Sequence, residues 1–256
     1  MVLFGQSCEG GNVPWYDKLL EDKCVLSTLV DSFATQTNCL GVLEKVAFEF
    51  LGLQLLEPLS TLMNWVLAFE CGYLYTRLKG EGSSFKKFWS YYFLISAISF
   101  VFGGFSHLIF NYTGMLGKIP NWSLGIIAAA CAEMGLISDI EDDKKRRMLL
   151  TVIRSAAFAS FVMLALDFHF KWVMVAVGLK FVFIIVTSIS RYRSGISGYK
   201  NFLIGAALLF LMAPVKIGEI DIHPAYFNRD DIAHFLMLPA YWFFFKGVTS
   251  VEEARE

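Results

Sequence analysis

Long apolar blocks constrain the fold of this chain more than any other feature of its sequence. The blocks are roughly 17–25 residues long, the length at which a helix spans about 30 Å of hydrocarbon. A helix in a soluble core rarely stays apolar on every face over such a length. The alternating pattern of a transmembrane barrel is absent. The sequence therefore predicts an all-α membrane protein, a bundle of about seven transmembrane helices.

The seven predicted spans cover residues 55–75, 88–110, 122–138, 148–168, 172–190, 202–217 and 231–245. They form one transmembrane domain, 51–247, between an N-terminal surface or interfacial segment, 1–50, and a short polar C-terminal tail, 248–256. The sixth span contains Pro214, which predicts a kink. The first residues lack the basic and apolar regions of a cleaved signal peptide, so the first span is expected to direct insertion.

Composition agrees with a membrane protein and excludes one class of partner. Of the 256 residues, 56% are hydrophobic and 18% are charged, whereas soluble domains carry about 25% charged residues. A net charge of -1 gives no electrostatic support for binding nucleic acid. Membrane lipids are therefore the expected partners.

Basic loops alternate along the chain with loops that are poor in Lys and Arg. The basic loops are TRLKGEGSSFKK, DIEDDKKRR and RYRSGISGYK, and the others are NYTGMLGKIPN, DFHFK and KIGEIDIHPAYFNRD. Because basic loops tend to stay in the cytoplasm, we expect a cytoplasmic C-terminus and a non-cytoplasmic N-terminus. All 4 histidines then fall toward the outer side, as does Glu57, so a polar cluster there is geometrically possible.

The last span, FNRDDIAHFLMLPAYWFFFKG, is the most informative stretch. Asp230 and His234 are spaced i, i+4, which places both on one face of a helix. Together with His107 at the end of the second span they could hold zinc, because imidazole and carboxylate suit this metal and catalytic sites combine three protein ligands with a water. In the alternative interpretation, Asp230 and Asp231 cap the last helix and His234 bonds a neighbouring helix.

The first span opens with EPLSTLMNW. Glu57 precedes Pro58, which is typical of a helix start. Ser60, Thr61 and Asn64 place polar atoms on one side of an otherwise apolar helix, and in lipid such groups must face other helices or a cavity. They predict either part of a functional site or hydrogen bonds between helices.

Two charged residues, Glu133 in the third span and Lys180 in the fifth, lie well inside apolar blocks. A charge near the middle of the bilayer costs several kcal/mol unless it is paired or hydrated. Both helices run inward from the outer side, so the two groups can meet at similar depths. They predict either a buried ion pair or part of a proton or ion path.

The motifs EPLSTLMN and DIAHFLMLPAY resemble those of the CREST superfamily of seven-span membrane proteins, which contains alkaline ceramidases and the progestin and adipoQ receptors, and of uncharacterised membrane proteins similar to it. Glu57, Thr61 and Asn64 match the ceramidase pattern in the first span. His107 and His234 fall at places comparable to family histidines in the second and seventh spans.

The resemblance implies a metal-dependent hydrolase of lipid amides or esters. Zinc held by His107, Asp230 and His234 would activate a water molecule for attack on the carbonyl. Glu57 and Asn64 would support this catalytic site from the first span.

Departures from the family pattern keep other functions open. Gly103 stands where the family has serine, and Asp230 stands where the first histidine of the last span would be. These changes favour a non-catalytic protein, either a lipid- or ligand-sensing receptor or an accessory subunit of a membrane complex. A third possibility, a small-solute or proton carrier, depends on Glu133 and Lys180.

Overall fold

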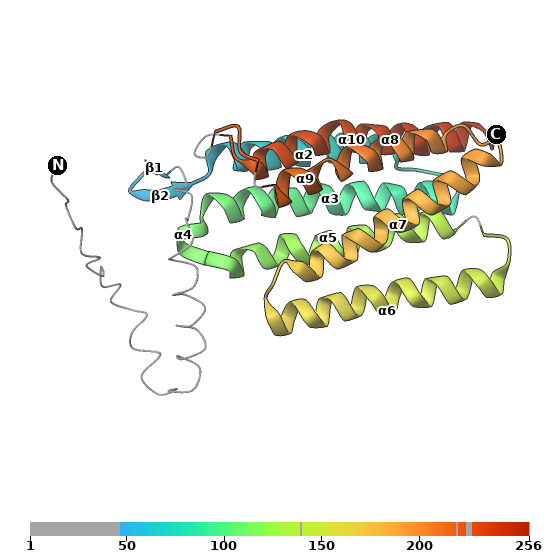
Figure 1. Cartoon of the computed structure of the whole chain (residues 1–256), viewed down its shortest axis with the longest axis horizontal. Coiled ribbons are helices and arrows are strands. Elements are labelled where there is room, and N and C mark those ends of the chain that lie inside the picture. The colour runs from blue at the N-terminus through green and yellow to red at the C-terminus, as the bar shows by residue number, and fades with distance from the viewer. Residues whose placement is uncertain (1–46, 139, 219, 224–226, 256) are drawn as a thin grey trace. The chain divides into compact units, whose positions relative to one another are not determined.

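Helices make up most of the structure (Figure 1). The computed structural model describes residues 47–255 except 139, 219 and 224–226. These residues belong to one compact unit, Lys45–Glu256, and a second unit, Met1–Glu44, lies outside the described part. The predicted N-terminal segment 1–50 therefore falls almost wholly outside it.

The longer helices are α2 (Pro58–Leu78), α3 (Ser84–Leu108), α5 (Ile119–Ile137), α6 (Asp143–Asp167), α7 (Lys171–Arg193), α8 (Tyr199–Phe210) and α10 (Arg229–Glu253). The shorter elements are β1 (Ala47–Phe50), β2 (Leu53–Leu56), α4 (Phe110–Thr113), the 3-10 helix η2 (Gly114–Lys118) and α9 (Met212–Ile217). Each predicted span overlaps a helix. The helical class is confirmed for the described residues, and the two-stranded hairpin is an addition that the sequence analysis missed.

Several helices begin or end at residues other than the predicted ones, and capping side chains explain two of these differences. Asp142 accepts hydrogen bonds from backbone N–H groups in the first turn of α6, so this helix begins at Asp143 rather than at 148. Ser83 caps α3 in the same way, by accepting from the backbone N–H of Lys86. At the other end of the chain α10 continues to Glu253, so most of the tail 248–256 is helical.

The sixth predicted span is divided where the sequence predicts a kink. α8 ends at Phe210 and α9 begins at Met212. Pro214 lies inside α9, and a proline ring clashes with the carbonyl of the residue four positions earlier, which here is Phe210. The proline therefore accounts for the position of the break.

The hairpin leads straight into the first long helix. Leu51 and Gly52 join the strands with φ angles of 52° and 77°, the left-handed conformation that suits tight hairpin turns. β2 is followed directly by Glu57, which precedes α2. The backbone N–H of Gln54 donates a hydrogen bond of 2.9 Å to the Tyr112 hydroxyl, which joins the hairpin to α4.

Aromatic side chains form the core between α3, α8 and α10. The Trp89 ring centroid lies 4.9 Å from that of Phe202 and 5.8 Å from that of Phe244, and all three side chains are fully buried. Tyr92 stacks on Tyr241 with centroids 5.6 Å apart. α3 also packs against α2 and α5, while α6 packs against α5 and α7 at the side of the bundle (Figure 1).

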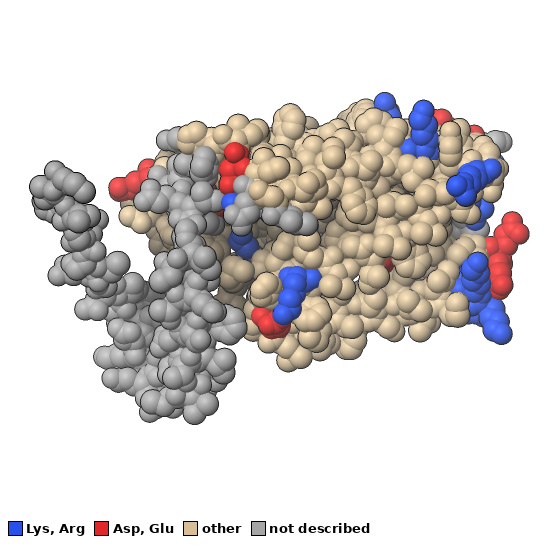
Figure 2. Space-filling view, in the orientation of Figure 1, with Lys and Arg blue, Asp and Glu red and all other residues tan. Residues whose placement is uncertain are grey.

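Within the described residues, 4 helical segments are long and apolar enough to cross a membrane, namely α3, Phe110–Ile137, α6 and α7. α6 leaves large apolar side chains uncovered, with Phe158 and Leu166 exposed by 70% and 74%. On the face shown in Figure 2, charged side chains lie mainly at the two ends of the helices and the middle is almost entirely uncharged. A surface of this kind suits contact with lipid.

We expect Gly205→Ala to destabilise the fold, because a Cβ on Gly205 would lie 2.9 Å from the Ala240 carbonyl oxygen and 2.7 Å from the Phe244 ring. Overpacking of this kind costs about 1–3 kcal/mol. The matched control is Gly72→Ala, where the new Cβ meets no atom within 4 Å; it should be neutral or stabilise by up to about 1 kcal/mol. Thermal unfolding in detergent measures both, and equal melting temperatures would contradict the packing of α8 on α10.

Candidate functional site

A cluster of buried or half-buried polar side chains lies at the end of the bundle where α2 and α10 begin and α3 ends. α2 packs against both α3 and α10 (Figure 1). The members of this polar cluster are Glu57, Ser60 and Asn64 at the start of α2, His107 at the end of α3, and Asp231 and His234 at the start of α10. Spacings of three and four residues keep the members from each helix on one face.

A short contact in the polar cluster joins Glu57 to His107. Nδ1 of His107 lies 2.6 Å from Oε2 of Glu57, and each residue is only 8% exposed. Glu57 has a left-handed backbone, with φ 48° and ψ 59°, a conformation that costs a non-glycine residue about 1–3 kcal/mol and that gathers at functional sites. A carboxylate in this position fixes the orientation of the imidazole.

Asn64 connects the first helix to His234. Its Nδ2 donates a hydrogen bond of 2.8 Å to the Ser60 carbonyl oxygen and lies 3.1 Å from Nε2 of His234. Because an amide nitrogen only donates, Nε2 of His234 accepts, and the neutral ring carries its proton on Nδ1. The Asn64 contact therefore sets the tautomer of His234.

Asp231 holds α10 against α2. Its Oδ1 accepts a hydrogen bond of 2.5 Å from the Ser60 hydroxyl, and its Oδ2 accepts one of 3.0 Å from the Asn228 backbone. Asn228 and Asp231 thereby form a capping box. The predicted cap is thus shared with Asn228. Asp231 is only 2% exposed, and it also bonds the neighbouring helix α2.

The structure brings His107 and His234 together, as the zinc hypothesis requires. Their ring centroids are 6.1 Å apart and the rings are almost perpendicular. Asp230, the predicted third ligand, is half-buried, and its backbone N–H donates to the Asn228 side chain. In the part of the chain that the structure describes, no group of three or more His, Cys, Asp or Glu side chains could hold a metal ion. The zinc site therefore stays a prediction.

Gly103 lets α3 approach the polar cluster closely. A Cβ at this position would lie 2.5 Å from Oδ1 of Asn64 and 3.1 Å from Nδ2 of Asn121, so a serine side chain here would displace Asn64. Asn121 in turn accepts a hydrogen bond of 2.6 Å from the Ser99 hydroxyl. Sequence reasoning missed Asn121 and Ser99, although polar residues inside apolar blocks were the signal used for the first span.

An apolar wall lies beside the polar cluster. Trp65 and Phe105 meet edge to face with centroids 5.4 Å apart, and they are 39% and 48% exposed. The helix surface next to the polar cluster is therefore suited to an acyl chain.

Glu133 and Lys180 form a second polar centre, deeper in the bundle. Both are buried, with 6% and 5% exposure. α5 and α7 pack against each other, and the ion pair between the two groups stays a prediction. Nζ of Lys180 also lies 5.2 Å from the Tyr92 ring centroid and 4.7 Å from that of Phe181, a favourable contact between a cation and aromatic faces.

Comparison with known families gives one match. A model described as a family of unknown function (DUF6962) covers residues 59–253. The matched region includes the polar cluster except Glu57, and both residues of the deeper centre. No curated protein matches the chain.

The hydrogen bond between Ser60 and Asp231 predicts strong coupling in a double-mutant cycle of Ser60→Ala and Asp231→Asn. A hydrogen bond to a charged group contributes about 1.5–3 kcal/mol, and the cycle isolates it from the capping role of Asp231. Unfolding free energies in mixed micelles measure the coupling. The control cycle combines Ser99→Ala with Asp231→Asn and should be additive, because Ser99 bonds Asn121 instead. Additivity in both cycles would show that the bond does not join α2 to α10.

Proposed function

The chain belongs to this family of unknown function (DUF6962), and we propose that it is an integral membrane hydrolase of lipid amides or esters. The observation that carries the proposal is the buried contact of 2.6 Å between Glu57 and His107, with the His234 ring beside it. A carboxylate that orients an imidazole is a recurring arrangement for general acid–base catalysis. The resemblance to the CREST superfamily is part of the same proposal.

The proposed topology has seven membrane crossings. The spans are α2, α3, α5, α6, α7, α8 with α9, and α10, with the N-terminus outside and the C-terminus in the cytoplasm. Support comes from the apolar surface of α6 and α7 and from the Lys and Arg side chains, which on the visible face gather mainly at the end where α10 finishes (Figure 2). This orientation places the polar cluster near the outer surface of the membrane.

The proposed reaction uses His107 as general base and then as general acid. Glu57 accepts the Nδ1 proton of His107 in a hydrogen bond, which directs Nε2 toward a water molecule. His107 takes a proton from the water as its oxygen bonds to the carbonyl carbon of the lipid. It then gives this proton to the leaving nitrogen or oxygen as the bond to the carbonyl carbon breaks. His234 Nδ1–H is a donor for the negative charge on the carbonyl oxygen.

The resemblance extends the proposal to zinc, for which His107 and His234 supply two imidazole ligands. A catalytic zinc site has three protein ligands, and the described residues do not assemble a third beside these two. We therefore assign the activation of water to His107 and Glu57. Zinc, if bound by the two histidines, would supply Lewis acidity at the same place.

The apolar wall supports a lipid substrate. Trp65 packs on Gly104 and on the Phe105 ring, and the adjacent Gly103 faces Asn64 of the polar cluster. An acyl chain on the exposed faces of Trp65 and Phe105 would place its carbonyl group near the polar cluster. The substrate would then enter sideways from the bilayer rather than from water.

We expect His107→Asn and Glu57→Gln to lower the rate of fatty-acid release from a panel of acyl amides and acyl esters. General acid–base catalysis contributes about 10²–10⁴-fold, so kcat should fall within this range for His107→Asn. The matched control is His169→Asn, because this histidine is exposed outside the polar cluster. Zinc content is measured in the same samples. No release by the wild type from any member of the panel would refute the hydrolase.

The proposed topology predicts the pattern of reporter fusions along the chain. Reporters placed after residues 79, 141, 195 and 256 should report the cytoplasm, because the basic loops lie there. Reporters placed after residues 116, 169 and 221 should report the opposite side. Alkaline phosphatase and a fluorescent protein give complementary signals at each site. If reporters at two consecutive sites reported the same side of the membrane, the chain between them would not cross it, and the proposed count of seven crossings would be wrong.

A second candidate function is a non-catalytic lipid receptor or accessory subunit. It is favoured by one observation, that the contacts of the polar cluster tie α2 to α3 and to α10. The polar cluster would then act as a clamp between helices. In that case His107→Asn would lower the melting temperature in detergent, and no lipid hydrolysis would be found.

A further inference from the structure

The deeper polar centre has no part in the proposed hydrolysis. Lys180 lies nine residues into α7, near the middle of that helix, and Glu133 lies fourteen residues into α5, about one turn before α5 ends at Ile137. At 1.5 Å per residue they are roughly 14 and 21 Å from the helix ends nearest the polar cluster. Both are buried. A carboxylate and an ammonium group at this depth are costly, and in membrane proteins they usually mark a functional site.

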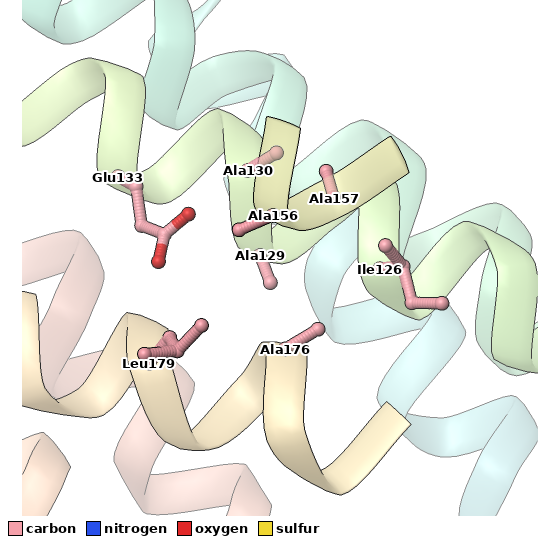
Figure 3. Close-up of a pocket in the computed structure, with 8 residues that line it drawn as sticks. All are labelled: Ile126, Ala129, Ala130, Glu133, Ala156, Ala157, Ala176 and Leu179. Atoms are coloured by element: carbon pink, nitrogen blue, oxygen red, sulfur yellow. The ribbon is translucent and has the colours of Figure 1, made fainter. Parts of the chain in front are cut away.

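The Glu133 carboxylate points into a small pocket between α5, α6 and α7 (Figure 3). The other lining residues are Ile126, Ala129, Ala130, Ala156, Ala157, Ala176 and Leu179. The space open to the centre of a water molecule is about 10 Å³, enough for about one water. Glu133 therefore faces a pocket about the size of one water molecule. Among the described residues that line this pocket, Glu133 alone is charged and the others are apolar.

Lys180 supplies the positive charge near Glu133. Its Nζ is held against the rings of Tyr92 and Phe181, and Lys180 immediately follows Leu179, which lines the same pocket as Glu133. On α6, the charged residue nearest in sequence to the pocket alanines is Arg154, which is exposed. On α3, the titratable group in contact with Lys180 is Tyr92. Lys180 is thus the buried counter-charge for Glu133.

We propose that Glu133 is a proton-exchange site that is reached through the alanine-lined pocket, with Lys180 as its counter-charge. A hydronium ion gives its proton to the carboxylate and leaves a water molecule in the pocket, and the reverse step restores the carboxylate. The donor set argues against a metal cation, because hard cations need about six oxygen ligands and the pocket offers one carboxylate among methyl groups. This site is independent of the proposed hydrolysis.

The test is pH-difference infrared spectroscopy of the full chain in proteoliposomes. A carboxylic-acid C=O band should grow as the pH falls, shift in heavy water and be lost in Glu133→Gln. Glu70→Gln is the matched control, since Glu70 is a half-buried carboxyl on α2, and it should keep the band of Glu133. A spectrum of Glu133→Gln identical to that of the wild type overturns the proposal.

Three further variants test the counter-charge and the route. Lys180→Met should move the appearance of the Glu133 band to higher pH, whereas Lys180→Arg keeps the positive charge and should leave it near the wild-type position. Ala156→Leu fills the pocket and should slow the heavy-water shift at least several-fold. An unchanged band position in a folded Lys180→Met, or an unchanged exchange rate in Ala156→Leu, contradicts the corresponding part of the proposal. Should Lys180→Met fail to fold, Glu133→Gln and Ala156→Leu decide the outcome.

Discussion

The absence of water in hydrocarbon is the constraint on which the proposed membrane structure depends. Backbone N–H and C=O groups must then bond within their own segment, which favours helices. The same constraint acts on side chains, because a polar group on an apolar helix must find a partner on another helix or in a cavity. Ser60 bonds Asp231, and Glu57 contacts His107. The polar residues therefore specify which helix faces meet, while the aromatic core supplies most of the packing.

Small residues determine how closely these faces approach. Gly103 and Gly104 leave room on α3 for Asn64 and for the Trp65 ring of α2, and Gly205 does the same for α10 against α8. Without the close approach of α2 and α3, the Glu57 carboxylate would not reach the His107 ring. Gly103 is therefore better explained as a packing residue than as a lost catalytic serine, and the site that remains is built from carboxylate, imidazole and amide groups.

The sequence predicts the helices well because hydrophobic blocks and helix caps are local signals. It also predicts that Glu57, Asn64, His107 and His234 lie at one end of the bundle, since their positions at helix ends follow from the order of the spans. It selected Asp230 for the site, whereas Asp231 is the residue that bonds α2. Adjacent positions differ by about 100° around a helix, and only the packing of α10 fixes its rotation. The hairpin was missed because four-residue strands carry too little pattern.

The hairpin has a consequence for how the polar cluster can be influenced from outside the bundle. No residue separates β2 from Glu57, and the bond from Gln54 to Tyr112 anchors the strand on α4. A displacement of the strands is therefore transmitted through a single peptide unit to the carboxylate that orients His107. In the proposed topology the hairpin lies outside the membrane, so a molecule that binds the hairpin would act on the contact between Glu57 and His107 without entering the bilayer.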